Sequence, residues 1–418
     1  MTINIPYGTS ALKISIPENR LLGILQNKIF PTKNIKKLLL KSLRLNDVPF
    51  SKKKVLIVVP DATRSGHLKE ILPVLLKKIS IPSRSIDIII ATGLHKRHTF
   101  DQLEKLLGQF ILKHYRVLHH DPSVASVINF GKTKYDVPIT LDRNLLNYDF
   151  IISIGVIEPH LYAGYSGGAK TVAIGLAGGE TINATHTIKF LDHPSTTIGS
   201  LERNTFQETL WQIIDKIQPL FAINTVNNAD GKALKIFTGA IVEVFEKGTD
   251  FAREVFEVGA SARADIVICG IGYPKDINLY QASRAINYVL NVDRPVVKKG
   301  GVVIVVAELK DGIGESRPEK RFYEELKNMR SARSFVHHVK TKGCIAGEHR
   351  AYMVAKALVD YNVIFVTKGH EDFMNGLPFK YFGDLPEALE SAEDIVGKNT
   401  KIYVIPRALA TIAKCNFA

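Results

Sequence analysis

Residues 153–190 read SIGVIEPHLYAGYSGGAKTVAIGLAGGETINATHTIKF. The apolar run Phe150–Ile157 leads into this stretch and has the composition of a buried parallel strand. Two Gly-Gly pairs follow it closely, at Gly167–Gly168 and Gly178–Gly179. Open α/β sheets bind ligands where a strand ends in a glycine-rich loop. We therefore expect this stretch to decide the fold and to contain the functional site.

The size and composition of the chain indicate a soluble globular protein. Its 418 residues are more than a domain with a single hydrophobic core usually contains, so two domains are expected. No apolar run approaches the roughly 20 residues that cross a bilayer, and the N-terminus lacks a signal-peptide pattern. Cys269, Cys344 and Cys415 lie far apart without a Cys-x-x-Cys spacing. These features predict a cytoplasmic protein without disulfides and without a membrane partner.

The formal net charge of +14 raises the question of nucleic-acid binding. The lysines are scattered in short runs such as Lys298-Lys299, without interleaved aromatic residues or a recognised nucleic-acid-binding module. We therefore predict a solvated basic surface and no nucleic-acid partner. Such a surface would also attract a small anionic substrate.

Strands and helices alternate in both halves of the chain, which predicts mostly parallel sheets covered by helices. In the first half we expect a hairpin of Ile3–Ile5 with Ala11–Ile16, and strands at 54–59, Ile86–Ala91, 117–118 and Phe150–Ile157. We expect helices at 33–43 and Leu68–Ile79, and a further helix that begins with a capping box of Thr99 and Gln102. In the second half we expect strands at Ala264–Gly270, Gly301–Ala307, Asn362–Thr367 and Lys401–Ile405, and helices near 318–328 and 346–359. The domain boundary should fall near residues 255–264.

Polar residues follow three of the predicted strands. Asp61 and Arg64 follow the first, His95 follows the second, and Glu158 and His160 follow the third. Parallel strands bring their carboxyl ends to a common edge, so these side chains can converge. Two histidines there suit a pair of acid and base groups near neutral pH. The alternative is that each histidine is a hydrogen-bonded structural residue.

The segment Ser166–Lys170 places two glycines beside a lysine. It lacks the glycine spacing and the Lys-Ser/Thr pair of a Walker A motif. A desolvated lysine in such a loop can act as a nucleophile, and an anion-binding turn is the alternative. His186 follows closely downstream. We interpret four other histidines as structural or surface residues: His98, His119, His120 and His193.

Arg64 and Arg284 are candidate clamps for a substrate carboxylate, because guanidinium offers paired donors of matching geometry. Gln281 and Arg284 are spaced i to i+3, so they share one helix face, and Tyr280 precedes them. These three residues can line a pocket from the second domain. Solvated surface arginines are the alternative.

Six spaced motifs together resemble the nickel-pincer-nucleotide lactate racemase family, and the resemblance covers essentially the whole chain. They are Asp-x-Thr-Arg at 61–64, Ala-Thr-Gly-x-His at 91–95, Glu-Pro-His at 158–160, Ser-Gly-Gly-x-Lys at 166–170, Thr-His at 185–186 and Gly-Tyr-Pro-x-Asp-Ile-Asn-Leu-Tyr-Gln at 272–281.

The resemblance implies a two-domain α/β fold with the active site in the cleft between the domains. One domain would comprise residues 1–258 together with a returning tail, 385–418, and hold the cofactor and catalytic residues. The other, residues 259–384, would close over the substrate.

The implied cofactor is a nickel ion held by a pyridinium-derived mononucleotide through two sulfurs and one carbon. The nucleotide would be tethered as a thioamide to Lys170, with Gly167, Gly168 and Asp61 nearby. His186 would complete a square-planar site, a donor set that suits Ni(II). Enzymes that synthesise the cofactor are implied as partners.

The implied reaction racemises or epimerises a small anionic 2-hydroxy acid by proton-coupled hydride transfer. One of His95 and His160 would remove the hydroxyl proton and the other would return it on the opposite side. Substrate would be bound by the following four residues: Arg64, Tyr280, Gln281 and Arg284.

Two departures from the family pattern bear on the substrate and the tether. The lactate enzymes have lysine at the position of Arg284, where an ammonium is not equivalent to a planar bidentate donor. They also have an arginine where this chain has Ala169, and Pro-Gly at Ile174-Gly175. An epimerase of a larger sugar acid and a non-catalytic cofactor carrier or sensor are therefore alternatives.

Overall fold

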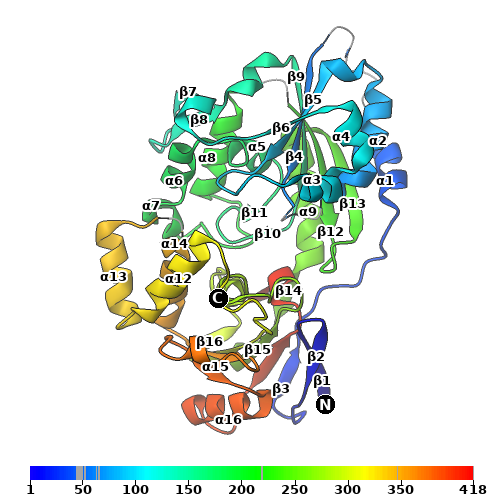
Figure 1. Ribbon diagram of the computed structural model, residues 1–418. Helices are drawn as coiled ribbons and strands as arrows, with labels where there is room; N and C mark the ends of the chain where they lie inside the picture. The colour runs from blue at the N-terminus through cyan, green and yellow to red at the C-terminus, as the bar shows by residue number, and fades with distance from the viewer. Residues whose placement is uncertain are drawn as a thin grey trace. The chain divides into compact units, whose positions relative to one another are not determined.

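The computed structural model describes residues 1–43, 50, 53–62, 64, 66–217, 220–345 and 347–417. The chain forms two compact units, each built on its own sheet (Figure 1). The first unit comprises residues 29–185 and 203–255. The second unit comprises residues 1–28, 186–202 and 256–418.

The first unit contains a six-stranded sheet in the order β13-β12-β9-β4-β5-β6. All neighbouring strands are parallel except β12 and β13, which form an antiparallel pair. Its strands are β4 (Val55–Pro60), β5 (Ile86–Ala91), β6 (Arg116–His119), β9 (Phe150–Val156), β12 (Leu220–Asn227) and β13 (Ala233–Ala240). Two small antiparallel pairs, β7 (Val127–Lys132) with β8 (Pro138–Asp142) and β10 (Pro159–His160) with β11 (Gly164–Tyr165), complete its strands.

Helices cover both faces of this sheet (Figure 1). They are α1 (Ile35–Ser42), α2 (Leu68–Ile79), α3 (Phe100–Leu107), α4 (Gln109–His114), α5 (Lys170–Ala173), α6 (Gly179–Thr185), α8 (Thr205–Ile214) and α9 (Ile241–Phe256). Helices α1 to α4 share one hydrophobic core with side chains of the central strands, such as Ile57 and Ile88. Helix α5 packs against β4 and β9. The sheet is therefore buried on both faces, as continuous apolar strands require.

The second unit contains a six-stranded, entirely parallel sheet in the order β18-β17-β16-β15-β19-β3. Its strands are β3 (Leu21–Ile24), β15 (Ala264–Gly270), β16 (Val297–Val306), β17 (Asn362–Val366), β18 (Lys380–Phe382) and β19 (Ile402–Ile405). The hairpin β1 (Thr2–Tyr7) with β2 (Ser10–Ser15), and the parallel pair β14 (Glu257–Ala260) with β20 (Ile412–Cys415), accompany it.

Two short helices of the second unit carry candidate site residues: α10 (Leu279–Ala282), which is N-capped by the Asn278 side chain, and α11 (Arg284–Leu290). The others are α7 (Ile188–Leu191), α12 (Arg317–Lys327), α13 (Ala332–Lys342), α14 (Glu348–Leu358), α15 (Glu371–Met374) and α16 (Leu385–Val396). Helix α16 and the hairpin β1–β2 share a hydrophobic core with the sheet.

The predicted fold class, an α/β protein with two mostly parallel helix-covered sheets, is confirmed. Helix Leu68–Ile79 and strands Ile86–Ala91 and Ala264–Gly270 have the predicted bounds. The Thr99/Gln102 capping box is also present. The first residue of the helix predicted at 346–359 lies outside the described residues, and α14 begins at Glu348.

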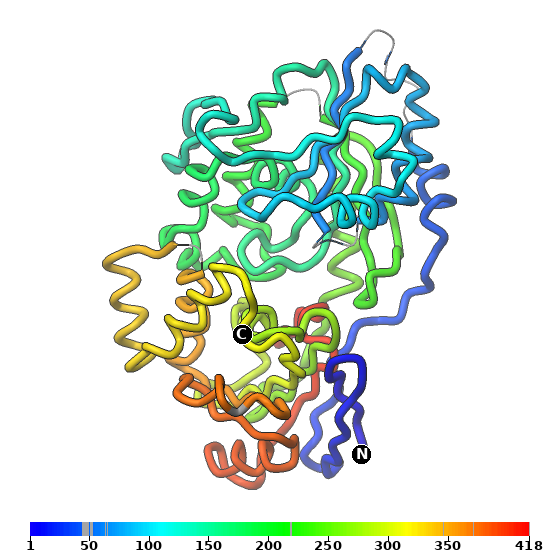
Figure 2. The backbone as a smooth tube through the Cα atoms, in the orientation of Figure 1, coloured from blue at the N-terminus to red at the C-terminus, as the bar shows by residue number. Residues whose placement is uncertain are grey.

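The division into units corrects the predicted domain bounds. The boundary near residue 256 agrees with the expected position, but residues 1–28 and 385–418 belong to the second unit. The reason is strand pairing: β3 near the N-terminus lies beside β19 near the C-terminus, in the same parallel sheet. In Figure 2 a blue stretch and a red stretch of the tube run side by side here, while the termini marked N and C lie apart.

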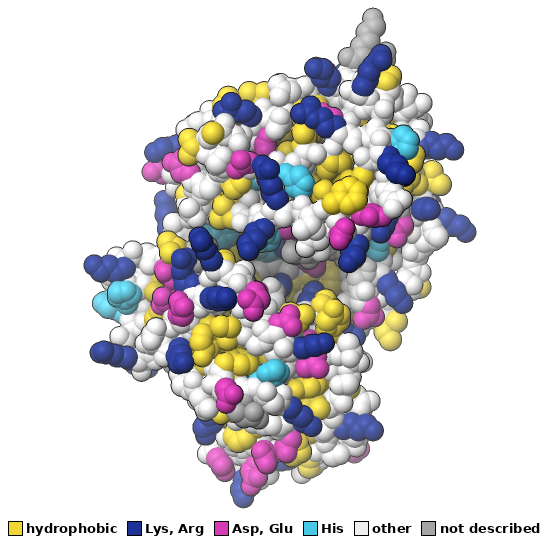
Figure 3. Space-filling model, viewed as in Figure 1, with side chains coloured by type: hydrophobic (Ala, Val, Ile, Leu, Met, Phe, Trp, Pro, Cys, Tyr) yellow, Lys and Arg dark blue, Asp and Glu magenta, His cyan; other side chains and the backbone are white. Residues whose placement is uncertain are grey.

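Charged side chains of both signs are visible on the surface. On the face drawn in Figure 3, Lys and Arg side chains are interspersed with Asp and Glu instead of gathering in one patch. In the described part of the chain, no helix combines the length and the hydropathy needed to cross a membrane.

Candidate active site

Three strands of the first unit end beside one another, because the sheet places β4 between β5 and β9. Asp61 and Arg64 follow β4, His95 follows β5, and Glu158 and His160 follow β9. The predicted convergence is confirmed by two direct contacts across this edge, Asp61 with His95 and Arg64 with Glu158. Thr63, the remaining specified residue of the first motif, lies outside the described residues.

The Asp61 carboxylate orients His95. Its Oδ2 lies 2.6 Å from His95 Nδ1, and Asp61 is 6% exposed whereas the His95 side chain is 65% exposed. A carboxylate only accepts, so in the neutral ring the proton sits on Nδ1 and is donated to Asp61. The Nε2 atom of His95 then carries the lone pair. This arrangement prepares His95 as a proton acceptor.

His160 has the opposite arrangement of ring nitrogens. Its Nδ1 accepts hydrogen bonds from two backbone N–H groups, those of Tyr162 at 3.2 Å and Ala163 at 3.1 Å. The ring stacks on Phe206 with centroids 6.3 Å apart. Because Nδ1 must be unprotonated to accept, the proton of the neutral ring is on Nε2. His160 is therefore prepared as a donor.

Arg64 pairs with Glu158, and both side chains are partly buried. The Glu158 backbone is fixed in turn by Ser166, whose Oγ accepts from Glu158 N at 3.2 Å and donates to Val156 O at 2.8 Å. Sequence reasoning assigned Arg64 to substrate and did not foresee this ion pair. The guanidinium also offers donors beyond the one that contacts Glu158.

Lys170 begins α5 directly after the two-glycine turn. The pKa of its ammonium is lowered to about 7, mainly by burial and also by the nearby Arg64 guanidinium, while Asp61 acts in the opposite direction. About half of an amine with such a pKa is neutral at pH 7. The lowered pKa is a property of nucleophilic lysines, one of the two alternatives that the loop sequence left open.

Gly167 and Gly168 adopt φ values of +80° and +49°. Both lie in the left-handed region, which glycine enters without a Cβ penalty. The backbone can turn here and present Lys170 at the same edge as Asp61 and Arg64, whose charges act on its pKa. The glycines predicted to be important are thus required by the conformation of the turn.

His186 lies in the second unit, directly after α6. Its ring makes an edge-to-face contact with His349, with centroids 5.7 Å apart, and its carbonyl is 3.8 Å from Cys344 Sγ. Burial lowers the pKa of His349 to about 3, with smaller contributions from His186 and Arg350. Because His349 is neutral, it leaves His186 able to serve as a metal ligand. The sequence did not single out His349.

Gln281 and Arg284 form one cluster in the second unit, but they lie on two consecutive short helices, α10 and α11, instead of the single helix face that the i to i+3 spacing predicted. Arg284 Nη1 donates to Gln281 Oε1 at 3.2 Å, and Nη2 donates to Tyr288 Oη at 3.3 Å. Among the described residues, no carboxylate lies within ion-pair distance of Arg284. Arg350, which sequence reasoning missed, is 8% exposed and lies over the Tyr280 ring at 5.1 Å. The cluster is cationic and suited to an anion.

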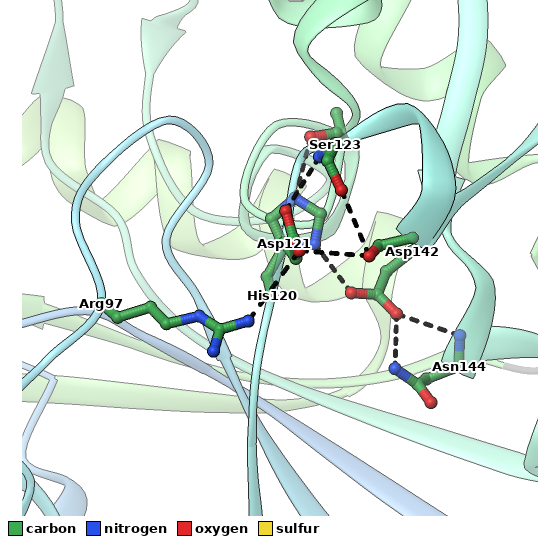
Figure 4. A network of polar contacts seen from close by, with 8 residues as sticks. Arg97, His120, Asp121, Ser123, Asp142 and Asn144 are labelled. Atoms are coloured by element: carbon green, nitrogen blue, oxygen red, sulfur yellow. Dashed lines mark hydrogen bonds and ion pairs between the residues drawn. The ribbon is translucent and has the colours of Figure 1, made fainter.

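His120 has a structural role, as expected. Figure 4 shows its ring beside Asp142, with Nδ1 2.8 Å from Oδ2, while Nε2 lies 2.9 Å from the carbonyl of Ala177. Asn144 donates to the other Asp142 oxygen from its backbone and its side chain. This buried network ties β6 and β8 to the chain that follows Lys170. It holds the loop without reaching the polar edge.

Metal ligation by side chains alone has no support in the described ranges, where no group of three or more His, Cys, Asp or Glu side chains could hold a metal ion. A metal bound mainly by a cofactor needs only one ligand from the protein.

Comparison with known proteins identifies relatives along nearly the whole chain. Residues 7–199 match the family model for the lactate racemase N-terminal domain, and residues 260–413 match that for the lactate racemase C-terminal domain. The lactate racemase of Thermoanaerobacterium thermosaccharolyticum is 30% identical, with 99% of each chain covered. That of Lactiplantibacillus plantarum is 28% identical, covering 99% of this chain and 100% of the relative.

Solved structures show the same similarity to lactate racemase. The lactate racemase apoprotein from Thermoanaerobacterium thermosaccharolyticum matches with a TM-score of 0.90 at 29% identity, over 99% of this chain and 100% of that one. A protein from Thermotoga maritima has a TM-score of 0.67 at 18% identity, over 91% and 96% of the two chains, which shows a shared fold.

The two histidines should differ in tautomer when neutral. In ¹⁵N-histidine-labelled protein at about pH 8.5, we expect His95 to be protonated at Nδ1 and His160 at Nε2. His95→Gln and His160→Gln variants assign the signals by their disappearance. Asp61→Asn should weaken the preference of His95 alone. The same tautomer at both rings would contradict the arrangement described.

The lowered pKa of Lys170 predicts an early onset of amine reactivity with pH. The neutral fraction of Lys170 should reach half near pH 7, because its ammonium loses a proton there, whereas ordinary lysines reach half near pH 10.4. Peptide mass spectrometry after brief labelling with an amine reagent at a series of pH values measures this, and surface lysines of the same protein are the reference. A Lys170 profile that coincides with theirs would refute the prediction.

Proposed function

This chain belongs to the lactate racemase family and is an isomerase, and we propose that it racemises or epimerises a 2-hydroxy acid with a lysine-tethered nickel-pincer nucleotide. The observation that carries this proposal is the pairing of two histidines of opposite hydrogen-bonding character with a lysine of lowered pKa at one sheet edge. Inverting a carbinol carbon requires proton acceptance on one side and proton delivery on the other.

The residues present fit the cofactor. A thioamide tether would need the Lys170 amine in its neutral form, and a pKa near 7 supplies that form under physiological conditions. Gly167 and Gly168 bring backbone close to the attached group, as glycines do beside phosphates and nucleotides. His186 offers an imidazole beside the neutral His349, and imidazole combined with sulfur donors suits Ni(II). When bound, the cofactor supplies a reversible acceptor for the hydride at C2 of the substrate.

His95 acts as the base for one enantiomer. Its Nε2 lone pair accepts the hydroxyl proton, and the resulting imidazolium is stabilised by Asp61, 2.6 Å from Nδ1. A buried carboxylate in this position is worth more than an exposed one, because the local dielectric is low. Asp61 therefore has a defined part in proton transfer in addition to any contact with the cofactor.

His160 serves the opposite side of the carbinol carbon. Its Nε2–H can donate to the oxygen of the keto acid while the backbone of Tyr162 and Ala163 holds Nδ1. Turnover of the other enantiomer exchanges the roles of the two histidines, so both are needed in both directions. Arg64, held by Glu158, supplies positive charge to orient the substrate carboxylate.

We propose that Arg284 and Gln281 recognise an anionic group of the substrate. The guanidinium is partly buried and donates to two neutral oxygens, so its positive charge remains available to an anionic group of the substrate. Lactate enzymes resemble this chain but have lysine at this position, as described above. We propose that the substrate is larger or more polar than lactate.

A non-catalytic cofactor carrier is the alternative from another class. A carrier needs Lys170 and His186 but no oriented acid–base pair, and the Asp61–His95 contact argues against it.

The decisive experiment is production of the protein together with the enzymes that synthesise the cofactor, followed by intact mass, nickel content and a chiral assay of 2-hydroxy acids. We expect a covalent adduct at Lys170, one nickel per chain, and interconversion of enantiomers. His186→Ala should retain the fold and the adduct but lose nickel. Loaded protein that leaves every hydroxy acid unchanged would favour the carrier.

Variants of the two histidines distinguish loss of the catalytic step from loss of cofactor binding. His95→Gln and His160→Gln should load normally and lose activity by 10²-fold or more in both directions, in the range known for general acid–base groups (about 10²–10⁴). A variant that loads and still racemises at the original rate would remove that histidine from the mechanism.

Arg284→Lys should change substrate preference. Replacing the planar guanidinium with an ammonium removes bidentate recognition, so kcat/KM should fall about tenfold or more for the best substrate and fall less for lactate. The midpoint of thermal unfolding should move little, because the residue is at a partly exposed helix start. Identical kinetics over a panel of hydroxy acids would show that position 284 does not read substrate.

A further inference from the structure

Strand β12 carries an asparagine at its centre, in the sequence Leu220–Asn227. Asn224 is completely buried and pairs in register with Gly155 of β9. An amide in the middle of a sheet must find hydrogen-bond partners inside the protein. Its partner is not in the sheet. Asn224 Oδ1 accepts from the backbone N–H of Gly168 at 3.0 Å, in the turn that precedes Lys170.

Two glycines make room for this bond. A Cβ atom on Gly155 would lie 2.8 Å from Asn224 Oδ1, and a Cβ on Gly167 would lie 2.5 Å from it. Both distances are shorter than real side-chain contacts allow. The amide therefore passes over one glycine in the sheet and reaches the turn beside another. Any larger residue at either position would displace it from Gly168.

Phe245 of α9 holds the turn from another direction. A Cβ on Gly168 would lie 2.5 Å from Cδ2 of its ring. Gly168 is thus fixed by a hydrogen bond to Asn224 and by close packing on Phe245. Its φ of +49° then sets the direction in which the chain leaves the turn toward Lys170, two residues later.

The amide nitrogen of Asn224 indicates that this residue does more than stabilise the fold. Its Nδ2 is buried and has no hydrogen-bond partner among the described residues. An unsatisfied buried donor destabilises the folded state, and leucine of similar shape would avoid it. The one satisfied contact is the bond that fixes the lysine turn.

We propose that Asn224 is a positioning residue for Lys170, acting through the Gly168 amide to hold the lysine amine at the carboxyl edge of the sheet. There the amine lies within the fields of Arg64 and Asp61, which both act on its pKa. Loss of the bond lets the turn relax and the amine reach water. The inference rests on the proposed role of Lys170 for its purpose, but its test reads the lysine directly in protein without cofactor.

The test is the pH profile of Lys170 labelling in the cofactor-free Asn224→Leu protein. We expect the midpoint to rise by about one pH unit or more, toward that of ordinary lysines, and labelling at pH 7 to fall several-fold. Thr225→Val is the matched control, because Thr225 is the next residue on β12, is completely buried, and its hydroxyl has no hydrogen-bond partner in the described ranges. Its Lys170 profile should equal that of the unmodified protein.

Gly155→Ala gives an independent perturbation that keeps the asparagine. The added methyl group would lie 2.8 Å from Asn224 Oδ1 and 2.8 Å from Thr171 Oγ1, so it disturbs both the amide and the residue after Lys170, and the midpoint should rise in the same direction. Hydrogen exchange in the unmodified protein requires no variant: the Gly168 amide should be protected. Rapid exchange at Gly168, or folded Asn224→Leu and Gly155→Ala proteins with an unchanged midpoint, would overturn the proposal.

The outcomes separate this inference from the proposed function. A shifted Lys170 profile with no nickel adduct under any condition would leave the positioning role standing and refute the cofactor. Normal adduct formation, together with an unshifted Lys170 profile in the Asn224→Leu protein, would support the cofactor and refute the positioning role of Asn224.

Discussion

A parallel sheet sends the carboxyl ends of its strands to one edge, and everything at the candidate site of the first unit depends on that constraint. The order β5-β4-β9 places residues nearly a hundred positions apart in direct contact. Because each strand is buried on both faces, its register is fixed by packing, and so are the positions of Asp61, His95 and Glu158. The chemistry is thus set by the core, and the loops supply only the final orientation.

The charges at this edge act together. Arg64 is paired with Glu158 and lowers the pKa of Lys170, while Asp61 orients His95 and opposes the effect of Arg64 on the lysine. A change at any one of these groups alters the others, because they share a partly buried site with low screening. Mutational effects at these positions should therefore not be additive.

The sequence was most informative where a strand is a continuous apolar run, as at Ile86–Ala91, and where a helix has clear periodicity, as at Leu68–Ile79. It also brought out the histidines, the lysine and the arginines, because their residue types carry the chemistry. The assignment of both chain ends failed, because pairing of β3 with β19 joins segments almost 400 residues apart and leaves no local signal. Asn224 was missed because β12 mixes polar and apolar residues, and only the fold shows that its amide reaches Gly168.

The pairing of the two chain ends has a consequence for synthesis on the ribosome. All residues of the first unit lie between positions 29 and 255, so that unit can complete its core while the rest of the chain is still being made. The second unit cannot, because β3 pairs only with a strand that is synthesised near the end. Until then, β3 has no neighbouring strand in its sheet. The earliest part of the chain to leave the ribosome is therefore among the last to find its place.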